Sequence, residues 1–324
     1  MRAYAERPSV TTVTCDRTGA AGLDFRPVTL ADLPLINRLL QNPVSRTCDY
    51  TVGGIFMWID CFQYQYCVID DTLFIRGVSE SHSDETAFSM PVGRMELDRA
   101  VGLILDYCGR EGIAPAFSVI PEDHVDRLAA LAGGRVETLD GWSDYLYSAE
   151  DLATLQGKHY SKKRNHVNRF MIDNPHYELE TLCPELVPET EMFLNGLAIG
   201  DKADAAMAAY ERRQCFDVLD ALGAYPFEGA VLRDETGTIC AFTIGEFIGD
   251  TLYVHIEKMN HEVAGAGETI NKLFAAEMLR RHRGLKYINR EEDMGDPGLR
   301  YAKESYRPVA KLAKYNIRPK EYVL

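Results

Sequence analysis

The chain contains 324 residues, of which 46% are hydrophobic and 26% are charged, a composition typical of a globular protein with about two domains. This balance excludes a mainly disordered chain, a collagen-like fibre and a small disulfide-bonded scaffold. The formal net charge of −14 repels polyanions over most of the surface, which argues against broad nucleic-acid binding.

The charge differs between the two halves of the chain. Residues 1–150 contain 12 Arg, no Lys and 22 acidic residues, a net charge of −10. Residues 151–324 contain every lysine of the protein, with 23 basic and 27 acidic residues in total. We therefore expect any anion-binding surface to lie in the second half.

The sequence indicates a cytoplasmic protein without a membrane segment. No run reaches the roughly 18 apolar residues that a membrane-spanning helix needs, and residues 1–22 lack the apolar core of a secretory signal. We expect those residues to form a flexible tail. The eight cysteines form no CxxC pair, which favours reduced thiols in a cytoplasmic protein.

The first half is predicted to alternate short strands and helices. Thr29 and Asp32 have the spacing of a capping box at the start of a helix, and Asp70-Asp71 separates two alternating segments as a hairpin turn would. In chain order we expect a strand at 23–28, a helix with the apolar stripe Leu33, Ile36, Leu39 and Leu40, a helix around 56–58, strands at 64–69, 72–78 and 87–91, a helix at 97–109, a strand at 115–120 and a helix at 123–131.

The second half is predicted to repeat this order of elements. The halves share no residue-level identity, so the repeat is one of architecture, and two unrelated α+β domains are the alternative. The expected ranges are a strand at 177–182, helices at 187–197 and 203–222, hairpin strands at 229–234 and 238–247, a strand at 251–258, a helix at 268–282, a strand at 285–289, a helix at 298–306 and a last strand at 309–317.

A basic segment at residues 157–169 contains no acidic residue, although acids exceed bases in the protein as a whole. On a helix, three- and four-residue spacing places Lys162, Asn165, His166 and Arg169 on one face. Clustered cations suit a phosphate, while a solvated helix that bridges two domains is the structural alternative. The candidate phosphate-binding residues are Lys162, Lys163, Arg164, His166 and Arg169.

A strand, a Gly-rich turn and a helix follow one another at residues 253–269. Period-two alternation places His255 and Glu257 on one face of the strand, as candidate catalytic residues that take a proton. The backbone N–H groups of Gly265 and Gly267 suit a phosphate or the oxyanion that forms when a carbonyl is attacked. The structural alternatives are a satisfied core histidine, a structural glutamate and a plain tight turn.

Four acidic residues crowd the end of the strand predicted at 285–289, where sites form in α/β-type sheets. Candidates for binding an acceptor or an ammonium group are Glu291, Asp293, Arg290 and Tyr306, and an internal ion-pair network is the alternative. We expect no metal, because calcium-loop spacing, HExxH and Cys/His zinc patterns are missing from the sequence. The sequence also lacks the motifs of serine hydrolases, P-loop enzymes and dinucleotide oxidoreductases.

Four runs of the sequence together carry a family resemblance. They are GWSDYLY at 141–147, KRNHVNRF at 163–170, HIEK at 255–258 and NREEDMG at 289–295, with Leu299-Arg300 and Ser305-Tyr306. With these runs, nearly all of residues 23–320 resembles the soluble, stand-alone relatives of the C-terminal domain of phosphatidylglycerol lysyltransferase, a bacterial family formerly of unknown function.

The resemblance implies an α+β fold of two tandem domains similar to the GCN5-related N-acyltransferases (GNAT). Each domain is expected to have a mixed, mostly antiparallel sheet flanked by helices. The expected organisation is a tail at 1–22, a first GNAT-like domain at 23–155, and a second at 156–324 that holds the basic junction helix and the active site.

The resemblance also implies an acyl- or aminoacyltransferase. The lysyltransferase moves an aminoacyl group from a charged tRNA to a lipid head group, and the wider fold binds acyl-CoA through a [QR]xxGx[GA] loop, whose spacing residues 262–267 share although they begin with Glu. We hypothesise that an aminoacyl-tRNA-like or acyl-CoA donor passes its acyl group to an amine or hydroxyl acceptor, without a tightly bound cofactor. The alternatives are an acetyl-CoA-dependent N-acetyltransferase and a non-catalytic ligand-binding or regulatory relative.

Overall fold

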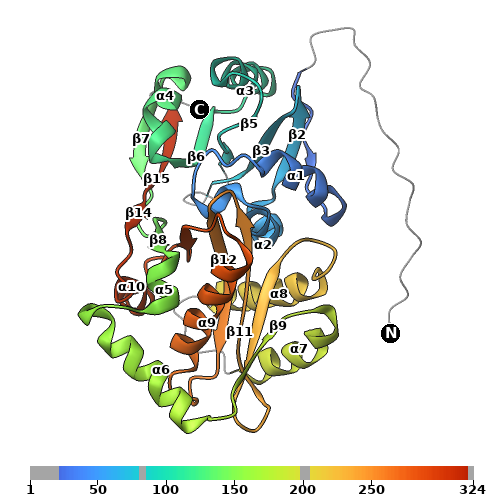
Figure 1. The fold of residues 1–324 in the computed structure, drawn as a ribbon. Coiled ribbons are helices and arrows are strands. Elements are labelled where there is room, and N and C mark those ends of the chain that lie inside the picture. Colours follow the sequence, from blue (N-terminus) through green and yellow to red (C-terminus); the bar gives the residue numbers. More distant parts are fainter. Residues whose placement is uncertain (1–21, 80–84, 198–204, 320–324) are drawn as a thin grey trace.

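Two mixed β-sheets, one above the other in Figure 1, form the frame of the protein. The computed structural model describes residues 22–79, 85–197 and 205–319, so all but one residue of the tail expected at 1–22 lies outside the described residues. The α+β fold class with two sheets is confirmed, because both sheets are mixed, mostly antiparallel and flanked by helices.

The first sheet has the strand order β1-β2-β3-β4-β6-β15-β7, with β5 paired to β3. The neighbours β4 and β6 run parallel and are connected through α3, and the other described neighbours are antiparallel. Its elements are β1 (Arg26–Pro27), α1 (Leu33–Leu40), α2 (Val52–Phe62), β2 (Gln65–Ile69), β3 (Thr72–Val78), β4 (Thr86–Phe88), β5 (Val92–Gly93), α3 (Leu97–Glu111), β6 (Ala116–Pro121), α4 (Glu122–Ala132), β7 (Gly134–Thr138) and β15 (Lys314–Pro319).

The second sheet has the order β9-β10-β11-β12-β13-β8-β14. Here β12 and β13 run parallel and are connected through α9. Its elements are β8 (Asp144–Ser148), α5 (Ala149–Thr154), α6 (Ser161–Asp173), β9 (Glu178–Thr181), α7 (Val187–Gly196), α8 (Ala205–Asp220), β10 (Glu228–Arg233), β11 (Ile239–Ile248), β12 (Thr251–Met259), α9 (Ala266–Arg281), β13 (Tyr287–Asn289), α10 (Pro297–Glu304) and β14 (Ala310–Leu312).

Most of the predicted helices and strands are present, in particular those with a strong capping, turn or periodicity signal in the sequence. The capping box of Thr29 and Asp32 forms, and the stripe that follows it is buried in α1. The hairpin around Asp70-Asp71 joins β2 to β3. The sequence patterns missed β7, β8 and α5, which are short.

Each sheet receives one strand from the other half of the chain. Strand β15, from the end of the second half, lies between β6 and β7, and strand β8, from the end of the first half, lies between β13 and β14. Corresponding strands then follow one another in the same order in the two sheets. The repeat of architecture therefore includes a reciprocal exchange of one strand between the sheets. The sheets are therefore divided differently along the chain from the domain boundary proposed at residue 155.

The single strand expected at 309–317 is wrong. The chain forms β14 in the second sheet, and then β15 in the first. Residues 309–317 contain no Gly or Pro and give no local signal for this crossing, because both segments are strands and only their partners differ.

A buried ion pair joins the first residues of the two exchanged strands. Lys314 Nζ lies 2.7 Å from Asp144 Oδ1, and both side chains are 0% exposed. The same Nζ lies 2.8 Å from Asp49 and 3.5 Å from Glu292. Burial disfavours charge on Lys314, but Asp144 and Asp49 outweigh it and raise its pKa well above the usual value.

We predict that Lys314→Met destabilises the protein by about 3–5 kcal/mol, because it leaves buried carboxylates without their cation. The matched control is Lys311→Met, since Lys311 pairs with Glu304 at 2.6 Å while both side chains are about half exposed, and such pairs contribute about 1 kcal/mol or less. Urea unfolding measures both. Equal losses in the two variants would contradict a structural role for the buried pair.

Candidate active site

The second sheet opens where β12 and β13 diverge. The two strands pair only from Thr251–Tyr253 to Tyr287–Asn289, whereas β12 continues to Met259. The chain leaves β13 at Arg290 and turns through residues 290–296, the acidic segment, before α10. Side chains from β12, α9 and this segment therefore meet in the opening.

Glu257 and Arg290 form an ion pair in this opening. Arg290 Nη2 donates to Glu257 Oε1 at 2.8 Å, and Asn271 Nδ2 donates to Oε2 at 3.2 Å. The guanidinium lies 4.9 Å from the ring centroid of Tyr306. Arg290 Nη1 and Asn271 Oδ1 are buried and have no hydrogen-bond partner among the described residues. Buried polar atoms of this kind are usually paired, so these two atoms have unused hydrogen-bonding capacity.

His255 lies buried between two carboxylates. Its Nδ1 is 2.7 Å from Glu291 Oε1, and its Nε2 is 2.9 Å from Glu246 Oε1. Burial disfavours the imidazolium, but hydrogen bonds to both glutamates outweigh it and raise the pKa of His255 to about 10. An imidazolium that donates from both nitrogens has no lone pair for a further proton. We therefore infer that His255 positions Glu291, which leaves Glu257 as the candidate base.

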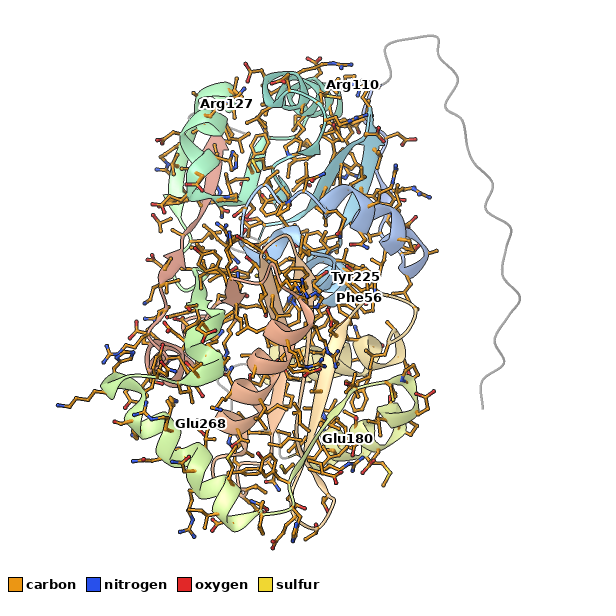
Figure 2. The ribbon with its side chains drawn as sticks, viewed as in Figure 1. Phe56, Arg110, Arg127, Glu180, Tyr225 and Glu268 are labelled. Atoms are coloured by element: carbon orange, nitrogen blue, oxygen red, sulfur yellow. The ribbon has the colours of Figure 1, made fainter. Side chains whose placement is uncertain are left out.

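The same contacts join the two halves of the chain. Glu246 also accepts a hydrogen bond from the backbone of Gly53 at 2.6 Å, in the first turn of α2, and one from Tyr225 at 2.7 Å. Figure 2 shows Tyr225 beside Phe56 of α2, where the sheets meet. Both rings pack on Phe227. A Cβ at Gly53 would collide with the His255 ring, so only glycine permits this approach.

Helix α6 contains the predicted basic residues. Lys162, His166 and Arg169 are exposed on one face, together with Asn165, while Val167 and Phe170 are buried. The exposed face agrees with the predicted periodicity, and its binding of phosphate stays a prediction.

On the exposed face, His166 lies 3.2 Å from Glu268 and Arg169 lies 2.5 Å from Asp173. The other two predicted cations of α6 are half-buried and also have partners. Lys163 Nζ lies 3.5 Å from Glu268 and 4.0 Å from the ring centroid of Tyr306. Arg164 donates to the carbonyl oxygens of Leu155 and Gly157. These contacts fix the helix against its neighbours.

Gly265 and Gly267 lie at the start of α9, against α6. Gly265 has a φ of +81°, a conformation that favours glycine, and a Cβ there would collide with the His166 carbonyl oxygen. At Gly267 a Cβ would meet the flexible end of Met259. Packing thus accounts for Gly265, and the oxyanion role of the two amides stays a prediction.

The acidic segment has two kinds of carboxylate. Asp293 accepts from Arg300 at 2.8 and 2.9 Å and from Tyr145 at 2.6 Å, and the Arg300 hydrogen bonds in particular lower the pKa of Asp293 to about 2. Asp293 therefore belongs to an internal ion-pair network. Glu291 and Glu292 instead face a pocket.

That pocket lies between α2 and the acidic segment, and sequence reasoning missed it. Trp142 is part of a run that carries the family resemblance, and no local pattern indicated the other walls. Its lining consists of Cys48, Asp49, Gly54, Trp58, Phe62, Tyr64, Trp142, Glu291 and Glu292.

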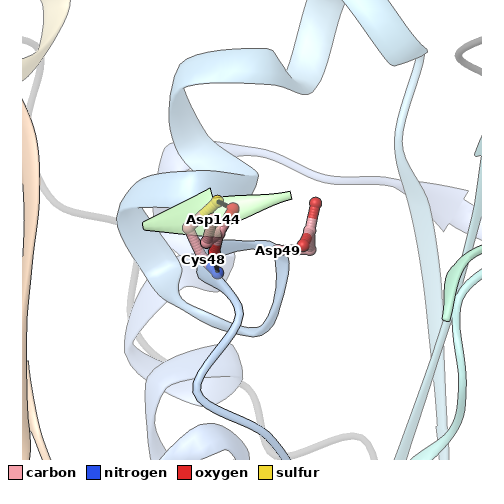
Figure 3. A group of neighbouring side chains, drawn as sticks. All are labelled: Cys48, Asp49 and Asp144. Atoms are coloured by element: carbon pink, nitrogen blue, oxygen red, sulfur yellow. Dashed lines mark hydrogen bonds between the residues drawn. The ribbon is translucent and has the colours of Figure 1, made fainter. Parts of the chain in front are cut away.

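Ligand atoms of Cys48, Asp49 and Asp144 lie within 4.8 Å of one another, close enough for a metal site; Figure 3 shows their arrangement. However, Lys314 Nζ lies 2.7 Å from Asp144 and 2.8 Å from Asp49. The lysine ammonium therefore takes the place of a metal cation.

The chain matches the family described as phosphatidylglycerol lysyltransferase, C-terminal, over residues 42–318. It belongs to this family. Among solved structures, a conserved protein of unknown function from Bacteroides thetaiotaomicron is 31% identical, with a TM-score of 0.82 over 91% of this chain and 99% of that one. This similarity extends over nearly the whole chain.

Two more distant structures share the fold. The C-terminal domain of a putative lysylphosphatidylglycerol synthetase from Agrobacterium fabrum is 16% identical, with a TM-score of 0.63 over 90% of this chain and 93% of that one. FemX is 9% identical, with a TM-score of 0.55 over 90% and 97%. A search of curated proteins gives no match. In the described part of the chain, no helix combines the length and apolarity needed to cross a membrane.

The raised pKa of His255 predicts a pH dependence of stability. The pKa is about 10 in the folded protein against 6.5 for an unperturbed histidine, so the stabilisation is complete below about pH 6.5 and is lost as pH rises toward 10. We expect the difference in unfolding free energy between wild type and His255→Gln to shrink over this range in urea titrations.

The control is His261→Gln, because His261 is exposed. It should follow the wild-type curve throughout. A difference between wild type and His255→Gln that grew with pH would contradict a charged, doubly paired His255.

Proposed function

We propose that the protein is an acyltransferase that moves an activated aminoacyl or acyl group to an amine or hydroxyl acceptor. Membership of the lysyltransferase C-terminal family supports the reaction class. The observation that carries the proposal is the Glu257 carboxylate, held by Arg290 and Asn271 in the opening between β12 and β13.

In the proposed reaction, Glu257 accepts the proton that the acceptor loses on attack. The acceptor nitrogen or oxygen forms a bond to the carbonyl carbon, the bond from that carbon to the donor's oxygen or sulfur breaks, and the proton passes to this leaving atom. The unpartnered Arg290 Nη1 and the amides of Gly265 and Gly267 are the candidate donors to the developing oxyanion.

The donor phosphates are proposed to lie on the exposed face of α6, along Lys162, His166 and Arg169. An RNA-linked donor is favoured over acyl-CoA, because Glu268 occupies the first turn of α9 and pairs there with Lys163 and His166. Exposed Glu262 precedes the same turn. Both carboxylates would repel a diphosphate at the helix N-terminus.

Glu257→Gln is expected to lower kcat by about 100-fold or more, because a positioned general base typically contributes 10²–10⁴-fold. The control is Glu277→Gln on α9, which removes a carboxylate paired with Arg280 and Arg281 outside the opening. Single-turnover transfer from an aminoacylated RNA minihelix to an amine measures both. Full turnover by the Glu257→Gln variant would eliminate Glu257 as the general base.

The double variant Lys162→Glu/Arg169→Glu is expected to weaken minihelix binding at least about tenfold and to flatten its dependence on salt, since fewer counterions are released. Fluorescence anisotropy measures the affinity. Arg283→Glu/Lys286→Glu is the charge-matched control, because Arg283 and Lys286 are exposed outside α6. Equal losses in both double variants would show that only overall charge matters.

A further inference from the structure

We propose that the pocket between α2 and the acidic segment binds an organic ammonium group of the substrate. This inference rests on the proposed function, and it narrows the acceptor from an amine or hydroxyl compound to an amine that enters as a cation. The bound ammonium group releases one proton to solvent before its nitrogen attacks, and the second proton, lost on attack, passes through Glu257 to the leaving atom. The pocket combines aromatic walls with an acidic end.

Aromatic side chains form one side of the pocket. Phe62 is central, with its ring centroid 6.0 Å from Trp58, 5.6 Å from Tyr64 and 6.2 Å from Trp142. Trp58, Tyr64 and Trp142 are half-buried, so their rings are partly available. Such rings attract an organic cation through their electron-rich faces and cover its apolar stem.

Carboxylates form the other end of the pocket. Asp49 comes from the first half of the chain, and Glu291 and Glu292 come from the acidic segment. An ammonium group carries three N–H donors, and carboxylate oxygens are strong acceptors for them. The pocket has a volume of about 20 Å³, room for little more than one water-sized group. It therefore offers hydrogen bonds to the ammonium head, and the stem leaves it along the half-buried rings.

The charges around this end do not balance among the described residues. One group of carboxylates surrounds Lys314, and a second group surrounds His255. Lys303 supplies a third cation, since its Nζ donates to the backbone oxygens of Arg290 and Glu292. Five carboxylates therefore face three cations: Asp49, Asp144, Glu292, Glu246 and Glu291 against Lys314, His255 and Lys303.

An excess of negative charge with low exposure selects a cation. Burial raises the pKa of Asp49, and the neighbouring Glu292 adds to this shift while Lys314 opposes it. An anionic head group would add like charge, and a neutral hydroxyl group would leave the excess uncompensated. An ammonium group compensates the charge and supplies donors to the carboxylates.

Tryptophan fluorescence tests the proposal directly, because both tryptophans of the protein line this pocket. The probes are n-butylammonium, 1-butanol and butyrate, titrated at constant ionic strength without any acyl donor. We expect a saturable fluorescence change with n-butylammonium alone. Equal responses to 1-butanol or butyrate, or no saturable response to n-butylammonium, would overturn the proposal.

Two variants keep the result interpretable. Glu291→Gln should weaken n-butylammonium binding at least about tenfold, as expected for the loss of a charged hydrogen-bond acceptor, whereas Glu277→Gln should bind as wild type. Trp58→Leu removes one ring and leaves Trp142 as the reporter, so weaker binding should still be measurable. Unchanged affinity in both Glu291→Gln and Trp58→Leu would overturn the assignment.

The binding measurement and the transfer measurement test the two proposals independently. Acylation of an amine that depends on Glu257 but shows no cation binding would reject this pocket and keep the proposed function. Cation binding with no transfer from any donor would reject the proposed function, and with it the reading of the cation as an acceptor.

Discussion

The buried pair of Lys314 and Asp144 is the contact on which the rest of the structure depends. It joins the first residues of β15 and β8, the strands that each half gives to the sheet of the other. Neither sheet has its full strand order without this exchange. Lys314 also lies 3.5 Å from Glu292, so the crossing of the strands and the wall of the pocket share one cation.

The site is consequently built from both halves of the chain. Helix α2 supplies ring walls, and its Gly53 backbone donates to Glu246, which pairs with His255 and through it with Glu291. These hydrogen bonds are buried, where each is stronger than in water and costly to leave unpaired. The candidate base Glu257 and its partner Arg290 lie beyond this chain of contacts, at the opening of the second sheet.

Elements whose signals are local could be predicted from the sequence. The capping box before α1, the hairpin turn at Asp70-Asp71 and the exposed face of α6 all follow from spacings of a few residues. The segment that contains Glu257, Arg290 and Glu291 could be singled out because charges there are unusually dense.

Features set by distant partners could not be predicted. Lys314 looks like an ordinary strand lysine, and its burial depends on Asp49 and Asp144, far away in the sequence. For the same reason, the sequence predicted a single strand at 309–317 and did not indicate that the chain crosses there from the second sheet to the first. Trp58 and Trp142 face one pocket only because α2 packs near the acidic segment.

The proposed reaction requires that an activated acyl group reaches this site on an RNA-linked donor. Thermal unfolding in the presence of saturating aminoacylated minihelix or coenzyme A tests it most directly, because a ligand that binds only the folded state must raise the unfolding midpoint. We expect a rise with the aminoacylated minihelix and none with coenzyme A. A rise with coenzyme A alone would contradict it and favour an N-acetyltransferase.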